Sequence, residues 1–121
     1  MKNILITGAL LMAMSVLLGA FGAHALKSIL TPQMLATYHT GVDYQFYHAI
    51  GLLIIGLTGF HVQSKWLNRA GALLIAGIVL FSGSLYILSL TGIKQIGMIT
   101  PIGGIAFVAG WICLAIALWK R

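Results

Sequence analysis

The sequence predicts an all-α polytopic membrane protein, built as a bundle of four transmembrane helices. Of its 121 residues, 60% are hydrophobic and only 7% are charged, whereas soluble domains are about 25% charged. The mean hydropathy is +1.05. Four segments approach the length of about 20 residues that a helix needs to cross a bilayer. We therefore expect residues 1–121 to form one transmembrane domain.

The first helix is expected at residues 4–26. Lys2, the apolar run and Ala23-His24-Ala25 also resemble a signal peptide, but the run has bilayer length, which favours a retained transmembrane helix. Small residues line two of its faces, a pattern typical of a helix with two neighbours; the first face holds Gly8, Ser15, Gly19 and Gly22, and the second holds Ala9, Ala13 and Ala20.

The other three helices follow from turn signals. Thr31-Pro32 reads as an N-cap and first helical residue, which predicts a short amphipathic or extension segment at 32–40 before a second helix at 41–60. A polar turn at 61–68 separates it from a third helix at 69–90. Thr100-Pro101 repeats the start signal and opens the fourth helix, at 100–119.

Four crossings place both termini on one side of the membrane, and the distribution of basic residues predicts which side. Lys27 and Lys94 lie at the opposite end; the terminal end would carry Lys2, Lys65, Arg69, Lys120 and Arg121. Basic residues concentrate in cytoplasmic segments, so the termini are expected in the cytoplasm. The net charge of +6 thus orients the protein and predicts no nucleic-acid partner. The three tryptophans are interpreted as interfacial anchors.

The stretch from Tyr38 to Gly51 holds the only acidic residue, Asp43, and two of the four histidines. Ionisable groups near a bilayer are costly unless paired, hydrated or used, which makes this stretch a candidate functional site. Because helix direction alternates, polar residues of all helices are expected to converge near the outer surface. The predicted ligand-binding residues are His24, Tyr44, Gln45, His48, Ser82 and Tyr86.

Three interpretations of this cluster stay open: a site for a small ligand, ion or lipid headgroup, interhelical hydrogen bonding alone, or chemistry. His39 and Asp43 are spaced i, i+4 and form a secondary polar pair. They would need a third ligand such as His24 to bind Zn²⁺ or Cu²⁺, whereas a solvated pair near the helix start needs none. We predict no metal site and no cofactor. No catalytic motif is present, so no catalytic residue and no enzymatic activity are expected.

The alternative hypothesis is a structural or accessory subunit that assembles with itself or with a partner membrane protein. Close helix packing in bilayers uses small residues three or four positions apart. The residues expected to provide such packing faces are Gly19, Ala23, Gly103, Ala106 and Gly110. Cys113 lies alone in an apolar run and is interpreted as another small packing residue.

Four motifs resemble a known family. They read G-A-F-G-A-H-A-L at residues 19–26, Y-x-T-G-x-x-Y-Q-x-x-H-A at 38–49, F-S-G-S-L-Y at 81–86, and T-P-I-G-G at 100–104 followed by G-W at 110–111. The chain resembles domain of unknown function 423 over essentially its whole length, and its eukaryotic relatives are named transmembrane protein 256. The resemblance implies a bacterial multi-pass inner-membrane protein with four helices. It implies no activity, substrate or cofactor.

Overall fold

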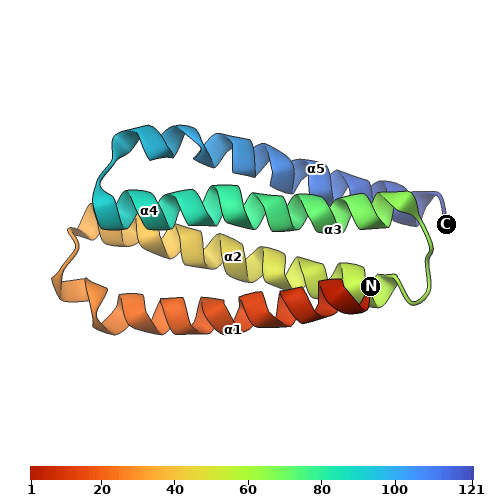
Figure 1. The fold of residues 1–121 in the computed structure, drawn as a ribbon, viewed down its shortest axis with the longest axis horizontal. Coiled ribbons are helices and arrows are strands. Elements are labelled where there is room, and N and C mark those ends of the chain that lie inside the picture. Colours follow the sequence, from red (N-terminus) through yellow and green to blue (C-terminus); the bar gives the residue numbers. More distant parts are fainter.

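A computed structural model describes all 121 residues as helices and turns, with no strand. Helix α1 spans Lys2–His24, α2 spans Pro32–Thr58, α3 spans Lys65–Gly77, α4 spans Gly83–Thr91 and α5 spans Thr100–Trp119. Short 3₁₀ turns follow α1 at Leu26–Ser28 and precede α5 at Lys94–Met98. A π-helical turn, η2, covers Ile78–Ser82 and joins α3 to α4 into one continuous rod (Figure 1).

Helix α2 is a single helix from its first turn. Thr31 caps it by accepting a hydrogen bond from the Met34 amide at 3.1 Å, and Pro32 occupies the first turn. The segment 32–40 is therefore the first part of the crossing helix and does not form a separate element. At 27 residues, α2 is about 40 Å long, since each residue adds about 1.5 Å.

One predicted boundary and one predicted helix cap were wrong. The turn predicted at 61–68 is shorter, because the Ser64 hydroxyl accepts from the Trp66 amide and starts α3 at Lys65. Thr100 begins α5 but does not cap it, since Ile99 occupies the N-cap position. The Thr100 hydroxyl lies 2.5 Å from the Ser84 hydroxyl instead. That hydroxyl already donates to the Phe81 carbonyl, so Thr100 donates to Ser84 and links α5 to α4.

The helices pack in the order α1, α2, α3 to α4, and α5. Helix α1 packs mainly on α2, the rod of α3, η2 and α4 packs on the other side of α2, and α5 packs on α3 and η2. Both chain termini lie at the same end of the bundle (Figure 1). The main core lies between α2, α3 and α5 and contains Leu52, Ile55, Leu67, Ala70, Leu74, Ile78, Phe107, Cys113, Leu114 and Ala117.

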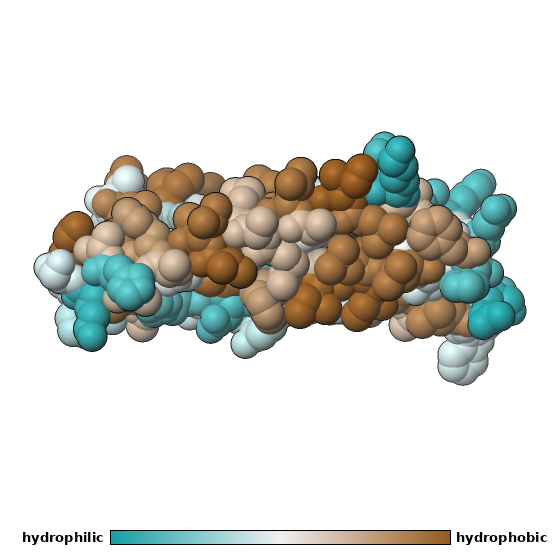
Figure 2. Space-filling model, turned by 90° about the horizontal axis from the view of Figure 1, so that it is seen from below, coloured by the Kyte–Doolittle hydropathy of each residue, from teal (hydrophilic) through white to brown (hydrophobic).

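The outer surface is predominantly apolar. Hydrophobic side chains cover most of the face in Figure 2, and hydrophilic ones gather towards the two ends. Three helical stretches are long and apolar enough to cross a membrane: Lys2–His24, Lys65–Thr91 and Lys94–Trp119. Helix α2 is not among them, because its polar stretch from Tyr38 to His48 dilutes its apolar character.

Candidate functional site

The six residues predicted to bind a ligand fall into separate environments. Gln45 and Tyr86 are joined inside the bundle, whereas Tyr44 and His48 line a cleft on another face of α2. Ser82 is fully buried, and His24 is exposed at the C-terminal end of α1. The split of α2 follows from helix geometry, since consecutive residues point about 100° apart. The predicted convergence of all six residues is therefore wrong.

Gln45 is the centre of an internal hydrogen-bond network. Its side chain is 2% exposed, its Nε2 donates to the Leu11 carbonyl at 2.9 Å, and its Oε1 accepts from the Tyr86 hydroxyl at 2.6 Å. These bonds tie α2 to both α1 and α4. Nearby, the Tyr38 hydroxyl donates to the Leu18 carbonyl at 2.5 Å. Because its polar atoms are paired within the chain, this network acts as interhelical bonding.

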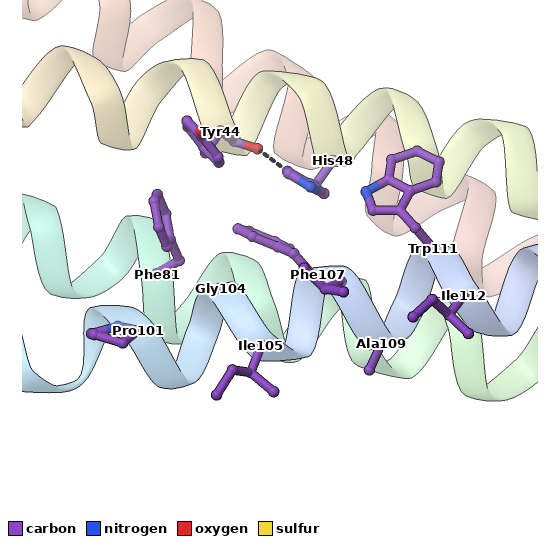
Figure 3. A pocket seen from close by; sticks show the side chains of 11 residues that line it. Tyr44, His48, Phe81, Pro101, Gly104, Ile105, Phe107, Ala109, Trp111 and Ile112 are labelled. Carbon is purple, nitrogen blue, oxygen red and sulfur yellow. Dashed lines mark hydrogen bonds between the residues drawn. The ribbon is translucent and has the colours of Figure 1, made fainter.

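His48 lies at the edge of a cleft between α2, η2 and α5, shown in Figure 3. The cleft has a volume of about 680 Å³, within the usual range for small-molecule sites. Most of its lining is apolar or aromatic; the lining residues are Tyr44, His48, Phe81, Pro101, Gly104, Ile105, Phe107, Val108, Ala109, Trp111 and Ile112. Helices α2 and α5 face each other here mainly through side chains, which leaves room between the backbones.

The hydrogen bond of His48 determines which nitrogen faces the cleft. Its Nδ1 lies 2.7 Å from the Tyr44 carbonyl oxygen, and a carbonyl oxygen only accepts, so Nδ1 carries the proton. In the neutral ring, Nε2 is then an acceptor. The side chain is 6% exposed, yet the only fully buried side-chain nitrogen or oxygen without a partner is Ser82 Oγ. Nε2, which has no hydrogen bond, therefore retains access to the cleft.

Aromatic stacking fixes the His48 ring. Its plane lies 9° from that of Phe107, with 3.5 Å between the ring centroids. Trp111 lies on the other side, 5.8 Å away, and Tyr44 packs against Phe81 at 4.5 Å. The imidazole therefore lies among rings of α2 and α5, and Phe81 of η2 packs behind them against Tyr44 and Phe107.

Two glycines allow these rings to approach. A Cβ atom at Gly77 would lie 2.3 Å from the Phe107 ring, and one at Gly51 would lie 2.9 Å from the Trp111 indole. The backbone of η2 also departs from a regular α-helix, because the Gly83 amide donates to the Ile78 carbonyl five residues earlier and forms a π-helical turn. Such turns are frequent at functional sites. Here the turn carries Phe81, one wall of the cleft.

A family described as "Protein of unknown function (DUF423)" matches residues 18–104. The UPF0382 membrane protein SH2409 of Staphylococcus haemolyticus is 50% identical over 120 residues, which cover 99% of this chain and 98% of the relative. The UPF0382 membrane protein YwdK of Bacillus subtilis is 46% identical over 121 residues, with 99% and 98% covered. The chain belongs to the DUF423 family. No solved structure matches it.

The DUF423 relatives are named membrane proteins, and this chain has apolar helices of membrane-spanning length. The protein is therefore a multi-pass membrane protein of a family without an assigned activity. The residues matched to DUF423 include Tyr44, His48, Phe81 and Gly104 of the cleft; Phe107 and Trp111 follow them in the chain.

The remaining polar residues predicted as site members lie outside the cleft. His39 is half-buried and meets Tyr38 edge-on at 5.9 Å, while Asp43 is exposed. No three His, Cys, Asp or Glu side chains lie close enough together to bind a metal ion. His61 is exposed in the turn after α2.

The predicted packing residues have different roles. The space beside Gly103 and Gly110 is filled by neighbouring helices of the same chain. A Cβ atom at Gly103 would lie 2.4 Å from the Phe81 backbone, and one at Gly110 would lie 2.7 Å from Leu74. They are not available to a partner, so the assembly faces expected there are wrong. Gly19 lies near Val42, Ala106 is half-buried and Ala23 is exposed.

Three aromatic residues that line the cleft were not predicted as site residues: Phe81, Phe107 and Trp111. The interpretation of all three tryptophans as interfacial anchors was wrong for Trp111, which lies in the middle of α5 and lines the cleft. Its position more than two turns from either helix end was the available signal. Trp66 differs: the Arg69 guanidinium lies 4.8 Å from its ring centroid, and the Lys120 amine 5.6 Å.

Proposed function

We propose that the protein crosses the membrane of the bacterial cell four times, with both termini in the cytoplasm. Helix α2 supports a fourth crossing, because its 27 residues run beside the three apolar rods (Figure 1). The basic residues at the terminal end outnumber Lys27 and Lys94 at the other end, which favours a cytoplasmic location for the termini.

Cysteine labelling tests this topology. In a Cys113→Ala background, Gln95→Cys is expected to react with a membrane-impermeant maleimide in intact cells, and Gln63→Cys only after the membrane is permeabilised. Both glutamines are exposed in turns at opposite ends of the bundle. Labelling of Gln63→Cys alone in intact cells would reverse the orientation. Labelling of both in intact cells would mean that an even number of crossings, and not the proposed single one, separates the two positions.

Within this bundle, we propose that the cleft between α2 and α5 binds a small amphipathic ligand from the bilayer. The observation that carries this proposal is the acceptor Nε2 of His48, which has no partner although the side chain is 6% exposed. Polar groups in an apolar setting are normally hydrogen-bonded. A ligand with a donor group would supply the missing bond, and its apolar part would fill the cleft.

Binding explains this cleft better than interhelical bonding does. Gln45 is an example of interhelical hydrogen bonding in this bundle, since its amide forms hydrogen bonds with two other helices. His48 reaches none, because its only hydrogen bond returns to Tyr44 on its own helix. The proposal includes no catalysis. The lining contains no serine, cysteine or carboxylate to act as a nucleophile or as the second member of an acid–base pair.

Native mass spectrometry of the gently extracted protein tests the binding. Gly104 lines the cleft and has only one neighbouring atom within 4 Å of a Cβ position, at 3.9 Å, so Gly104→Leu is expected to fill the cleft without breaking the fold. Gly83→Leu is the matched control, because nothing lies within 4 Å there. An adduct kept by wild type and Gly83→Leu but lost from Gly104→Leu supports the site. An adduct retained by all three, or absent from wild type, contradicts it.

A second candidate function is assembly with another membrane protein or with a second copy. Helix α1 packs almost only on α2, and its second small face, Ala9, Ala13 and Ala20, is exposed, as is Ala23. The same spectra report stoichiometry. A stable oligomer that is lost in Ala13→Leu would support this function, and a monomeric protein would count against self-assembly.

A further inference from the structure

Three of the residues that line the cleft carry polar groups. Its lining contains the His48 ring, the Tyr44 hydroxyl and the Trp111 indole N–H (Figure 3). Nε2 of His48 accepts, the indole only donates, and the hydroxyl does either. The ring of His48 is bonded to the chain only through Nδ1, and no hydrogen bond joins its Nε2, the hydroxyl or the indole N–H to the rest of the chain. A ligand that uses the whole set needs at least one donor, placed opposite His48.

The lining also excludes charged ligands. None of the eleven residues is Lys, Arg, Asp or Glu, so an anionic headgroup would find no cation and a metal ion no carboxylate. A buried charge without a partner is costly in an apolar environment. A neutral ligand fits this chemistry better than a phosphate, a carboxylate or a cation.

The shape of the walls favours a ring. Tyr44 and Trp111, at the two ends of the cleft, are each 38% exposed, which leaves part of each aromatic surface free to contact a ligand. His48, Phe107 and Phe81 form the wall between them. Aromatic groups gain additional stabilisation from offset or edge contacts with other rings. A volume of about 680 Å³ accommodates a ring and the first part of an apolar tail.

We propose that the ligand is a neutral, lipid-soluble ring with a hydroxyl group, of the phenol or hydroquinone class, whose O–H donates to Nε2 of His48. This inference rests on the proposed function of the same cleft. The hydroxyl satisfies the unpaired acceptor, the ring lies among the aromatic walls, and the tail leaves through the open side of the cleft towards the lipid. The proposal concerns binding and includes no electron transfer.

The test follows the three tryptophan indole N–H resonances by NMR in detergent micelles. Trp111 reports on the cleft, and Trp66 and Trp119 at the basic end serve as internal controls. The probes are a hydroquinone with a decyl chain and its dimethyl ether, which keeps the ring and tail but has no O–H donor. The hydroquinone is expected to shift only the Trp111 signal, saturably, and to bind about tenfold more tightly than the ether, as expected when a buried acceptor is left unpaired.

His48→Phe completes the comparison, because it keeps a ring on Phe107 but removes the acceptor. Its affinity for the hydroquinone should fall to that for the ether. Equal affinities of the two probes for wild type would overturn the assigned ligand class. If neither probe shifts Trp111 while a Gly104-sensitive adduct is present in native spectra, the class is wrong and the binding function stands. If neither probe shifts Trp111 and no Gly104-sensitive adduct is present in native spectra, both the ligand class and the binding function are wrong.

Discussion

The imidazole of His48 lies flat on the ring of Phe107, with 3.5 Å between centroids and 9° between planes. This contact joins α2 to α5 where their backbones stay apart. The ring of Phe107 is in turn placed by Gly77 of α3, where a Cβ atom would lie 2.3 Å from it. The orientation of the His48 ring, whose Nε2 is unpaired, thus depends on the absence of a side chain at Gly77 of α3.

Gly77→Ala is expected to destabilise the protein by about 1–3 kcal/mol, the usual cost of overpacking a core. Phe107 is buried and stacked on His48, so its ring cannot move aside freely. Thermal unfolding in detergent measures the effect. Gly83→Ala is the control and should be neutral or stabilising, since its Cβ meets nothing within 4 Å. Equal unfolding temperatures for the two variants would contradict the close packing at Gly77.

Gln45 and Tyr86 should show energetic coupling in a double-mutant cycle. Gln45→Leu and Tyr86→Phe each remove the 2.6 Å bond between the two side chains. Hydrogen bonds of this kind in membrane proteins average about 0.6 kcal/mol and reach about 1.7 kcal/mol, so a coupling energy in that range is expected in reversible unfolding. Neither substitution touches the cleft lining, and the Trp111 response to the probes should persist. Additive effects would mean that the bond contributes no stability.

Ser82→Ala should leave stability unchanged or increase it, although sequence analysis placed Ser82 in the ligand site. Its side chain is 0% exposed and its hydroxyl has no hydrogen-bond partner, which is an unfavourable arrangement. Ser84→Ala is the matched comparison and should be destabilising, because it removes the bond from Thr100. Unfolding temperatures of the two variants check the prediction. A larger loss for Ser82→Ala would show that its hydroxyl has a partner in the membrane.

The sequence predicts the helical architecture well because the physics involved is local. Apolar runs of bilayer length and the Thr31-Pro32 start signal fall on helices of the structure. The site is harder to predict because it depends on contacts between distant residues. Tyr44 and Gln45 are adjacent and both polar, yet one lines the cleft and the other bonds to α1 and α4.

The cleft itself has no local signature. Phe81, Phe107 and Trp111 are ordinary residues for membrane helices, and only the fold brings them to His48. The π-helical turn at Ile78–Ser82 also lacks a sequence signal that we recognised. Tyr44 and His48 could be predicted as site residues, because polar groups in an apolar segment are recognisable without any knowledge of their partners.

The most direct test of the central claim is the nitrogen-15 NMR spectrum of His48 in bilayers, assigned by comparison with His48→Phe. Our account predicts a neutral ring protonated at Nδ1, with an unprotonated Nε2 whose resonance moves when the decyl hydroquinone is added and stays fixed with the dimethyl ether. A ring protonated at Nε2, or an Nε2 resonance that neither probe shifts, would contradict the claim that His48 presents a free acceptor to a ligand in the cleft.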